Sequence, residues 1–160
     1  MAYWKVSQVG GAYADASWVY ANVGQTSRSN GFMGVTQSGA SGKGDSTLTL
    51  SQSDIFIPAD AMVEASAWVK PLRSSNHVRG GKAFSIALVF DGEAVVTLTP
   101  SSTSGKTLVS SKIAVNNAMD LHTLALVVRT QGVDDKNIFA ADDFVIKVVS
   151  GPNNLKLCTE

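Results

Sequence analysis

The sequence has few of the residues that build metal centres, disulfides and strongly charged surfaces. Its 160 residues include one cysteine, Cys158, and two histidines, His77 and His122. A single cysteine excludes an intrachain disulfide, and so few sulfur and imidazole ligands argue against a structural zinc site. Charged residues make up only 16% of the chain, and 13 basic side chains balance 13 acidic ones. This balance argues against a nucleic-acid or anionic-membrane binder, which needs surplus Lys and Arg.

Targeting and membrane-spanning signals are also missing. The first residues show no basic segment followed by an apolar run, so they do not have the pattern of a secretory signal. No stretch approaches the ~18 consecutive apolar residues that a membrane helix requires. We therefore expect a protein that is made in the cytoplasm and does not enter a membrane.

The residues that are abundant favour strands. The chain contains 19 Ser, 11 Thr and 19 Val, and 44% of its residues are hydrophobic. β-branched residues favour extended backbone, and small polar residues favour turns. A chain of this length buries roughly 70% of its unfolded surface, which is enough for one domain with a true core.

Polar and apolar residues alternate with a period of two in several segments, as expected for strands with one buried face. In residues 61–70, one face carries small apolar side chains and Trp68 lies on the other. The buried face of this segment is predicted to hold Val63, Ala65, Ala67 and Val69. Further strands are predicted at 17–22, 31–37, 46–51, 54–58, 107–115, 121–129 and 138–149, with loops at 37–45 and 73–81.

The strongest local signal is a hairpin around Asp91-Gly92. This dipeptide lies between two β-rich runs, 82–90 and 93–99. An Asp-Gly pair there predicts a type I′ turn, because both central residues need positive φ. The predicted core face of the first strand consists of Phe84, Ile86, Leu88 and Phe90.

Eight to ten strands without a convincing long helix predict an all-β sandwich of two antiparallel sheets. We expect one domain. Residues 1–45 would form a Gly/Ser-rich arm with the first strands, 46–150 the sandwich core, and 151–160 a short tail.

The order of features in residues 46–150 resembles the jelly-roll carbohydrate-binding modules, in the style of families 4 and 9. The resemblance rests on Leu48-Thr-Leu50, Trp68-Val-Lys70, the apolar hairpin, and the closing run from Phe139 to Ile146. It implies a jelly roll, and it implies that Asp142 or Asp143 in the closing strand could bind calcium. The family's Asn-Gly-x-Phe-Glu-like opening is absent, so the usual acidic partner of that calcium is missing.

Viral capsid and lectin domains share this fold, and small jelly rolls that begin at their own Met resemble bacteriophage cement, decoration and tail proteins. This resemblance favours a structural virion protein, specifically a capsid decoration protein bound to the major capsid protein. Such a protein would form a homo-oligomer, for which a trimer is natural. Aromatic residues near the start are the expected partner contacts: Tyr3, Trp4, Trp18 and Tyr20.

The alternative is a carbohydrate-binding module or a phage tail domain that recognises cell-surface glycan. An aromatic ring packs well against the C–H face of a sugar, and Trp68 is the candidate in a confident strand. Binding would need further polar groups, which the 73–81 loop could supply.

No catalytic set is evident, and we expect no enzyme and no cofactor beyond the calcium. Gly105-Lys106-Thr107 lacks the first glycine of a phosphate loop, and a strand is predicted to follow it where the motif needs a helix. His122 is expected to be a half-buried strand residue and His77 a solvated one. Adjacent Asp142 and Asp143 point to opposite faces of a strand, and Asp134/Asp135 and Asp91/Glu93 fit turns, so no carboxylate pair converges as glycosidase chemistry requires.

Overall fold

The computed structural model describes residues 4–10, 13–15, 32–37, 45–73, 84–99, 106–116, 121–130 and 136–151. Several sequence predictions lie outside these residues: the 17–22 strand, most of both loops, His77, Asp134, Asp135 and Cys158. The described part contains ten strands: β1 (Lys5–Val9), β2 (Tyr13–Asp15), β3 (Phe32–Gln37), β4 (Ser46–Phe56), β5 (Met62–Arg73), β6 (Phe84–Phe90), β7 (Glu93–Leu98), β8 (Thr107–Ala114), β9 (Leu121–Thr130) and β10 (Lys136–Ser150).

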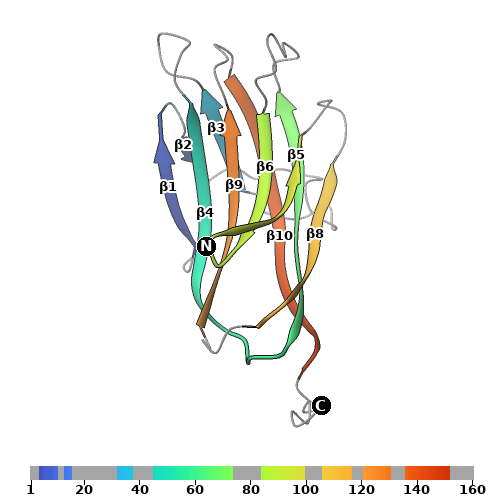
Figure 1. Cartoon of the computed structure of the whole chain (residues 1–160). Helices are drawn as coiled ribbons and strands as arrows, with labels where there is room; N and C mark the ends of the chain where they lie inside the picture. Colours follow the sequence, from blue (N-terminus) through green and yellow to red (C-terminus); the bar gives the residue numbers. More distant parts are fainter. Residues whose placement is uncertain are drawn as a thin grey trace.

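The strands form two antiparallel sheets that face each other. Sheet A has the order β1-β4-β9-β6-β7 and sheet B the order β2-β3-β10-β5-β8. Figure 1 shows sheet A in front of sheet B. The predicted all-β sandwich is confirmed, and β9 is a central strand, paired with both β4 and β6. Within the described residues, no helix is long and apolar enough to cross a membrane.

The core lies between the sheets and follows the predicted alternation. On β5, the side chains of Val63, Ala65, Ala67 and Val69 are fully buried, whereas Trp68 on the opposite face is only partly buried. Sheet A contributes larger side chains to the same core, including Leu48, Leu50, Ile86, Leu88, Leu124, Leu126 and Val128. Removing this apolar surface from water is the main force that holds the two sheets together.

Several strand boundaries differ from the sequence prediction. Residues 54–58 do not form a separate strand, because β4 continues to Phe56 through a bulge between Gln52 and Ile55. Asp54 has a φ of 60° within this bulge, where the pairing register with β9 shifts. Within residues 1–45, where an arm and the first strands were expected, residues 5–9 form β1 and pair with β4 along their whole length.

An aromatic contact joins this first strand to the opposite sheet. The register of β10 against β5 shifts between Asp142 and Val145, and Asp143 there has a φ of 48°. Phe144, in the bulge, lies with its ring centroid 4.6 Å from that of Trp4, which precedes β1. Both side chains pack against the core. β3 pairs with β10 only as far as Ala141, so the contact closes the sandwich just beyond the end of β3.

The predicted hairpin turn is confirmed and is anchored to β9. Asp91 and Gly92 have φ values of 49° and 86°, as a type I′ turn requires. The backbone N–H of Asp91 donates to the carbonyl of Thr123 at 2.9 Å, and the N–H of Thr123 donates to Asp91 Oδ1 at 2.9 Å. The carboxylate thus ties the turn to the neighbouring strand.

His122 completes this anchor and is more buried than predicted. Its side chain is fully buried, with Nδ1 2.7 Å from Asp91 Oδ2 and Nε2 3.1 Å from the carbonyl oxygen of Ile57. Its ring also stacks on Phe90 at 5.2 Å between centroids. Both polar partners are acceptors, so the ring donates to both only when each nitrogen carries a hydrogen. We call this set of contacts the Asp91–His122 anchor.

We predict that Asp91→Asn lowers the free energy of unfolding by about 1–2 kcal/mol, the usual cost of a lost buried hydrogen bond. Asn tolerates positive φ as Asp does, so the variant tests the anchor and not the turn geometry. Urea unfolding measures the loss. Glu93→Gln is the matched control, because Glu93 is exposed beside the same turn and should change stability by less than about 0.5 kcal/mol. Equal stability of Asp91→Asn and the parent protein would contradict the anchor.

We predict that Trp4→Ala destabilises the sandwich by roughly 2 kcal/mol, because it removes a large, partly buried ring from Phe144 and the core. Thermal and urea unfolding measure the change. Gln8→Ala in the adjoining strand β1 is the control, since Gln8 is exposed. If Trp4→Ala unfolds like the control, the segment is a separable arm after all.

Candidate functional site

The outer face of sheet A, which points away from the core, consists almost entirely of small side chains. Cross-strand pairing arranges fourteen of them in three rows over β1, β4, β9, β6 and β7. The rows are Val9-Thr47-Arg129-Ser85, Ser7-Thr49-Val127-Ala87-Thr97, and Lys5-Ser51-Ala125-Val89-Ala94. Twelve of these fourteen residues are Ser, Thr, Ala or Val. We call this surface the small-residue face.

The small-residue face is hollowed where β6, β7 and β9 meet. The hollow has a volume of about 260 Å³. It is lined by Ser85, Ala87, Val89, Gly92, Ala94, Thr97, Val127 and Arg129. Alanines beside the larger Val and Thr side chains leave this space, and the glycine of the hairpin leaves one end of it open.

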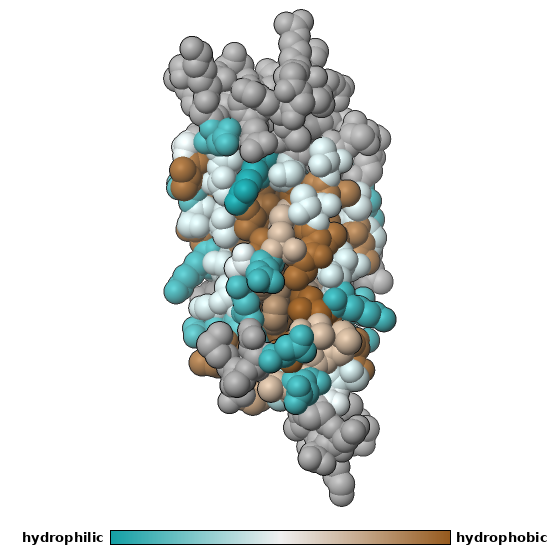
Figure 2. Space-filling model, in the orientation of Figure 1, coloured by the Kyte–Doolittle hydropathy of each residue, from teal (hydrophilic) through white to brown (hydrophobic). Residues whose placement is uncertain are grey.

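Figure 2 shows this side of the molecule, with an apolar stripe running down the middle, pale residues beside it, and hydrophilic residues both at the rim and next to the stripe. Contiguous apolar surface with a polar border is typical of interaction sites on soluble proteins. At about 4.8 Å between strands and 3.3 Å per residue, the rows span roughly 19 Å by 13 Å. The face is therefore long enough for an extended ligand, and its hydroxyl groups can both donate and accept hydrogen bonds.

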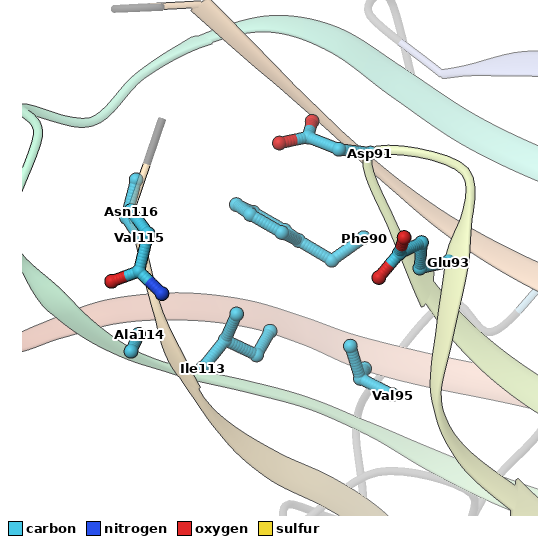
Figure 3. A pocket seen from close by; sticks show the side chains of 8 residues that line it. All are labelled: Phe90, Asp91, Glu93, Val95, Ile113, Ala114, Val115 and Asn116. Carbon is cyan, nitrogen blue, oxygen red and sulfur yellow. The ribbon is translucent and has the colours of Figure 1, made fainter. Parts of the chain in front are cut away.

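A second hollow lies at the end of the sandwich beside the hairpin (Figure 3). Its volume is about 250 Å³. The ring of Phe90 projects into it, and the carboxylates of Asp91 and Glu93 and the amide of Asn116 stand around it. Both oxygens of Asp91 already accept hydrogen bonds in the anchor. One of the residues around this end pocket, Asp91, therefore already holds the turn. The size of the pocket suits a small ligand better than a glycan chain.

Trp68 lies on the outer face of sheet B, in register with Leu108 and Asp142. The ammonium of Lys106 is 5.0 Å from the centre of its indole ring, a cation–π contact. A sugar stacking on that side of the ring would have to displace Lys106. Two residues further along the same face, Ala140 is paired with Lys70 and is fully buried, so that part of the sheet is covered. Sugar stacking on Trp68 remains a prediction.

Of the four aromatic residues expected to contact a partner, the structure describes only Trp4. Trp4 contacts Phe144 and the core, so its ring serves the fold. Tyr3, Trp18 and Tyr20 lie outside the described residues. Their role as partner contacts remains a prediction.

The structure adds one observation to the predicted calcium site. Asp142 Oδ2 is buried and has no hydrogen-bond partner among the described residues, as a carboxylate oxygen prepared for a cation would be. Calcium takes six to eight oxygen ligands, however. The described residues contain no group of three or more His, Cys, Asp or Glu side chains that could hold a metal. Asp142 alone does not make the donor set, and calcium at Asp142 or Asp143 stays a prediction.

The anchor contains a His–Asp pair but not the geometry of a catalytic triad. A triad histidine keeps one ring nitrogen for the nucleophile. Both nitrogens of His122 are taken, one by Asp91 and one by the Ile57 carbonyl. Lys106 is followed by β8 and not by a helix, so the phosphate-loop alternative fails as expected. The hydrogen bonds of His122 and Asp91 account for the burial of His122 without a catalytic role.

The small-residue face was not predicted from the sequence. The alternation in β4, β6 and β9 predicted the buried half of each pattern, and the outward half was not interpreted as a surface. The signal was present, since the outward positions of β4 read Thr47, Thr49 and Ser51. Which strands would lie side by side, and so build one surface, was not readable from the chain.

Comparison with known proteins finds solved structures with a similar fold. No protein-family model matches the sequence, and no curated protein matches it. Among solved structures, a family 22 carbohydrate-binding module with its xylanase from Clostridium thermocellum has a TM-score of 0.58 at 17% identity, over 96% of this chain and 27% of that one. The family 61 module TmCBM61 has a TM-score of 0.51 at 13% identity, over 91% and 88%.

A viral protein is also similar. The enzymatically active domain of tailspike protein 4 from bacteriophage CBA120 has a TM-score of 0.57 at 12% identity, over 92% of this chain and 20% of that one. The chain thus spans about a fifth to a quarter of the tailspike and xylanase structures. At these identities the likeness concerns the β-sandwich fold alone.

Proposed function

We propose that the protein is a carbohydrate-binding module that holds a glycan chain against the small-residue face of sheet A. The observation that carries the proposal is the hollow floored by Ala87, Val89 and Val127 within a face of hydroxyl-bearing and small apolar side chains. The apolar floor suits the C–H faces of sugar rings. Ser and Thr around it offer hydrogen bonds to sugar hydroxyls.

The similar structures support this assignment. The structure that contains the family 22 module together with the xylanase module is a complex with xylohexaose, and TmCBM61 was solved with β-1,4-galactotriose; both ligands are oligosaccharides of several sugar units. A face about 19 Å across agrees with a ligand of that kind better than with a monosaccharide. Binding without catalysis agrees with the filled hydrogen-bonding positions of His122 and Asp91.

We place this activity on a bacteriophage particle, where a glycan-binding module would recognise the host surface. The likeness to a tailspike domain supports this setting. Capsid decoration, with the major capsid protein as partner and a trimeric assembly, remains a prediction from the sequence. None of the described contacts favours it over glycan binding.

We predict that Ala87→Gln, which fills the hollow with a neutral side chain, weakens glycan binding at least about tenfold, or 1.4 kcal/mol. A glycan array with neutral and acidic members identifies the ligand, and calorimetry gives the affinity. Ser110→Gln is the matched control, because Ser110 is exposed on the opposite sheet. Asn116→Ala in the end pocket should also leave binding unchanged.

The outcomes separate the alternatives. Loss of binding in Trp68→Ala with Ala87→Gln unaffected would move the site to sheet B. Absence of binding to every member of the array would overturn the proposed function. A dimer that Ala87→Gln dissociates, again without glycan binding, would show that the face is a contact between copies of the chain.

A further inference from the structure

We infer that the small-residue face selects glycan chains that carry acidic groups, such as uronic acids. This inference rests on the proposed function and specifies the class of ligand. The argument is the charge of the face. Its fourteen side chains include two cations, Lys5 and Arg129, and no acid. In a chain with equal numbers of acidic and basic residues, this surface is locally positive.

Arg129 is placed to contact a ligand in the hollow. It lines the hollow at the end of β9, between Thr47 and Ser85 in the first row, and its side chain is exposed. It forms no ion pair with any residue that the structure describes. A guanidinium offers a planar pair of N–H donors that matches a carboxylate, so it recognises an acidic sugar more specifically than a hydroxyl.

The described acidic groups of sheet A lie beyond the three rows. Asp45 is exposed just before β4, two residues from Thr47, and Asp54 is exposed in the bulge of β4, three residues past Ser51, where its Oδ2 accepts a hydrogen bond from Ser53. Glu93 pairs with Phe90 at the hairpin and lines the end pocket. Asp91 has its carboxylate turned to His122 and Thr123. The negative charge near the hairpin is therefore directed toward the anchor and the end pocket, not onto the face.

The second cation sets the length of the ligand. Lys5 on β1 is two strands from β9, and its row crosses β9 at Ala125, four residues before Arg129. Strand spacing and rise per residue put the Lys5 and Arg129 positions about 16 Å apart. This exceeds the screening length of about 8 Å at physiological salt, so the two charges act as separate contacts. A chain with acidic groups on sugars some distance apart can reach both, whereas a single acidic sugar reaches one.

The test uses pairs of glycans that differ only in charge. Polygalacturonate and alginate are measured beside the same polymers with their carboxyl groups converted to methyl esters or reduced to alcohols, within an array that also holds unrelated neutral glycans. We expect the full-length protein to prefer the acidic members, and to lose that preference as salt rises, because exposed ion pairs are screened.

Variants assign the preference to the face. Arg129→Gln should weaken binding of the acidic polymer about fivefold, the effect of one exposed ion pair, and leave the neutral counterpart unchanged. Lys5→Gln should act in the same direction. Lys112→Gln is the matched control, because it removes one positive charge from an exposed position on the opposite sheet. Unfolding curves show whether each variant keeps its fold.

The binding results distinguish failure of the charge inference from failure of the proposed function. Equal binding of acidic and neutral counterparts, or better binding of neutral glycans, would overturn the charge inference and leave the proposed function standing. An acidic preference that Arg129→Gln keeps and Lys112→Gln loses would place the charge recognition on sheet B, and would also overturn it. No binding to any member of the array would overturn both the inference and the proposed function.

Discussion

The pairing of the two sheets across a shared apolar core is the constraint on which everything else depends. Each strand has two faces, and burying one commits the other to the outside. On β5 the buried face is reduced to Val and Ala, while β4, β6 and β9 supply Leu, Ile and Phe against it. The larger residues of sheet A thus fill the space that the small residues of sheet B leave, as close packing requires.

Burial of the inner face of sheet A leaves the small-residue face exposed and holds its strands in place. β9 is central in sheet A, and its inward residues Leu124, Leu126 and Val128 are all buried. Its outward residues Ala125, Val127 and Arg129 therefore stand on a rigid strand. A surface on paired strands costs less to order on binding than one carried by loops, so even weak individual contacts with a ligand add up.

The Asp91–His122 anchor joins core to surface. The hairpin that it holds carries Phe90 into the core, and Gly92 and Ala94 along the edge of the hollow. A buried histidine with an acceptor oxygen within hydrogen-bond distance of each ring nitrogen lies between the turn, β9 and the segment after β4. Loss of the anchor would therefore lower the free energy of unfolding and would also leave the hairpin at the edge of the proposed site less firmly positioned.

By itself, the sequence determined the strands and their buried faces. Alternation is a local property, and it identified Val63, Ala65, Ala67 and Val69 as core residues. The Asp91-Gly92 pair, also a local signal, identified the turn. It did not determine that residues 5–9 join sheet A, because an exposed edge strand lacks alternation. It also could not show that His122, Asp91 and Ile57, or the outward residues of five strands, meet in space. Those neighbours are set by sheet order, which depends on contacts between residues far apart in the chain, and only the tertiary structure decided them.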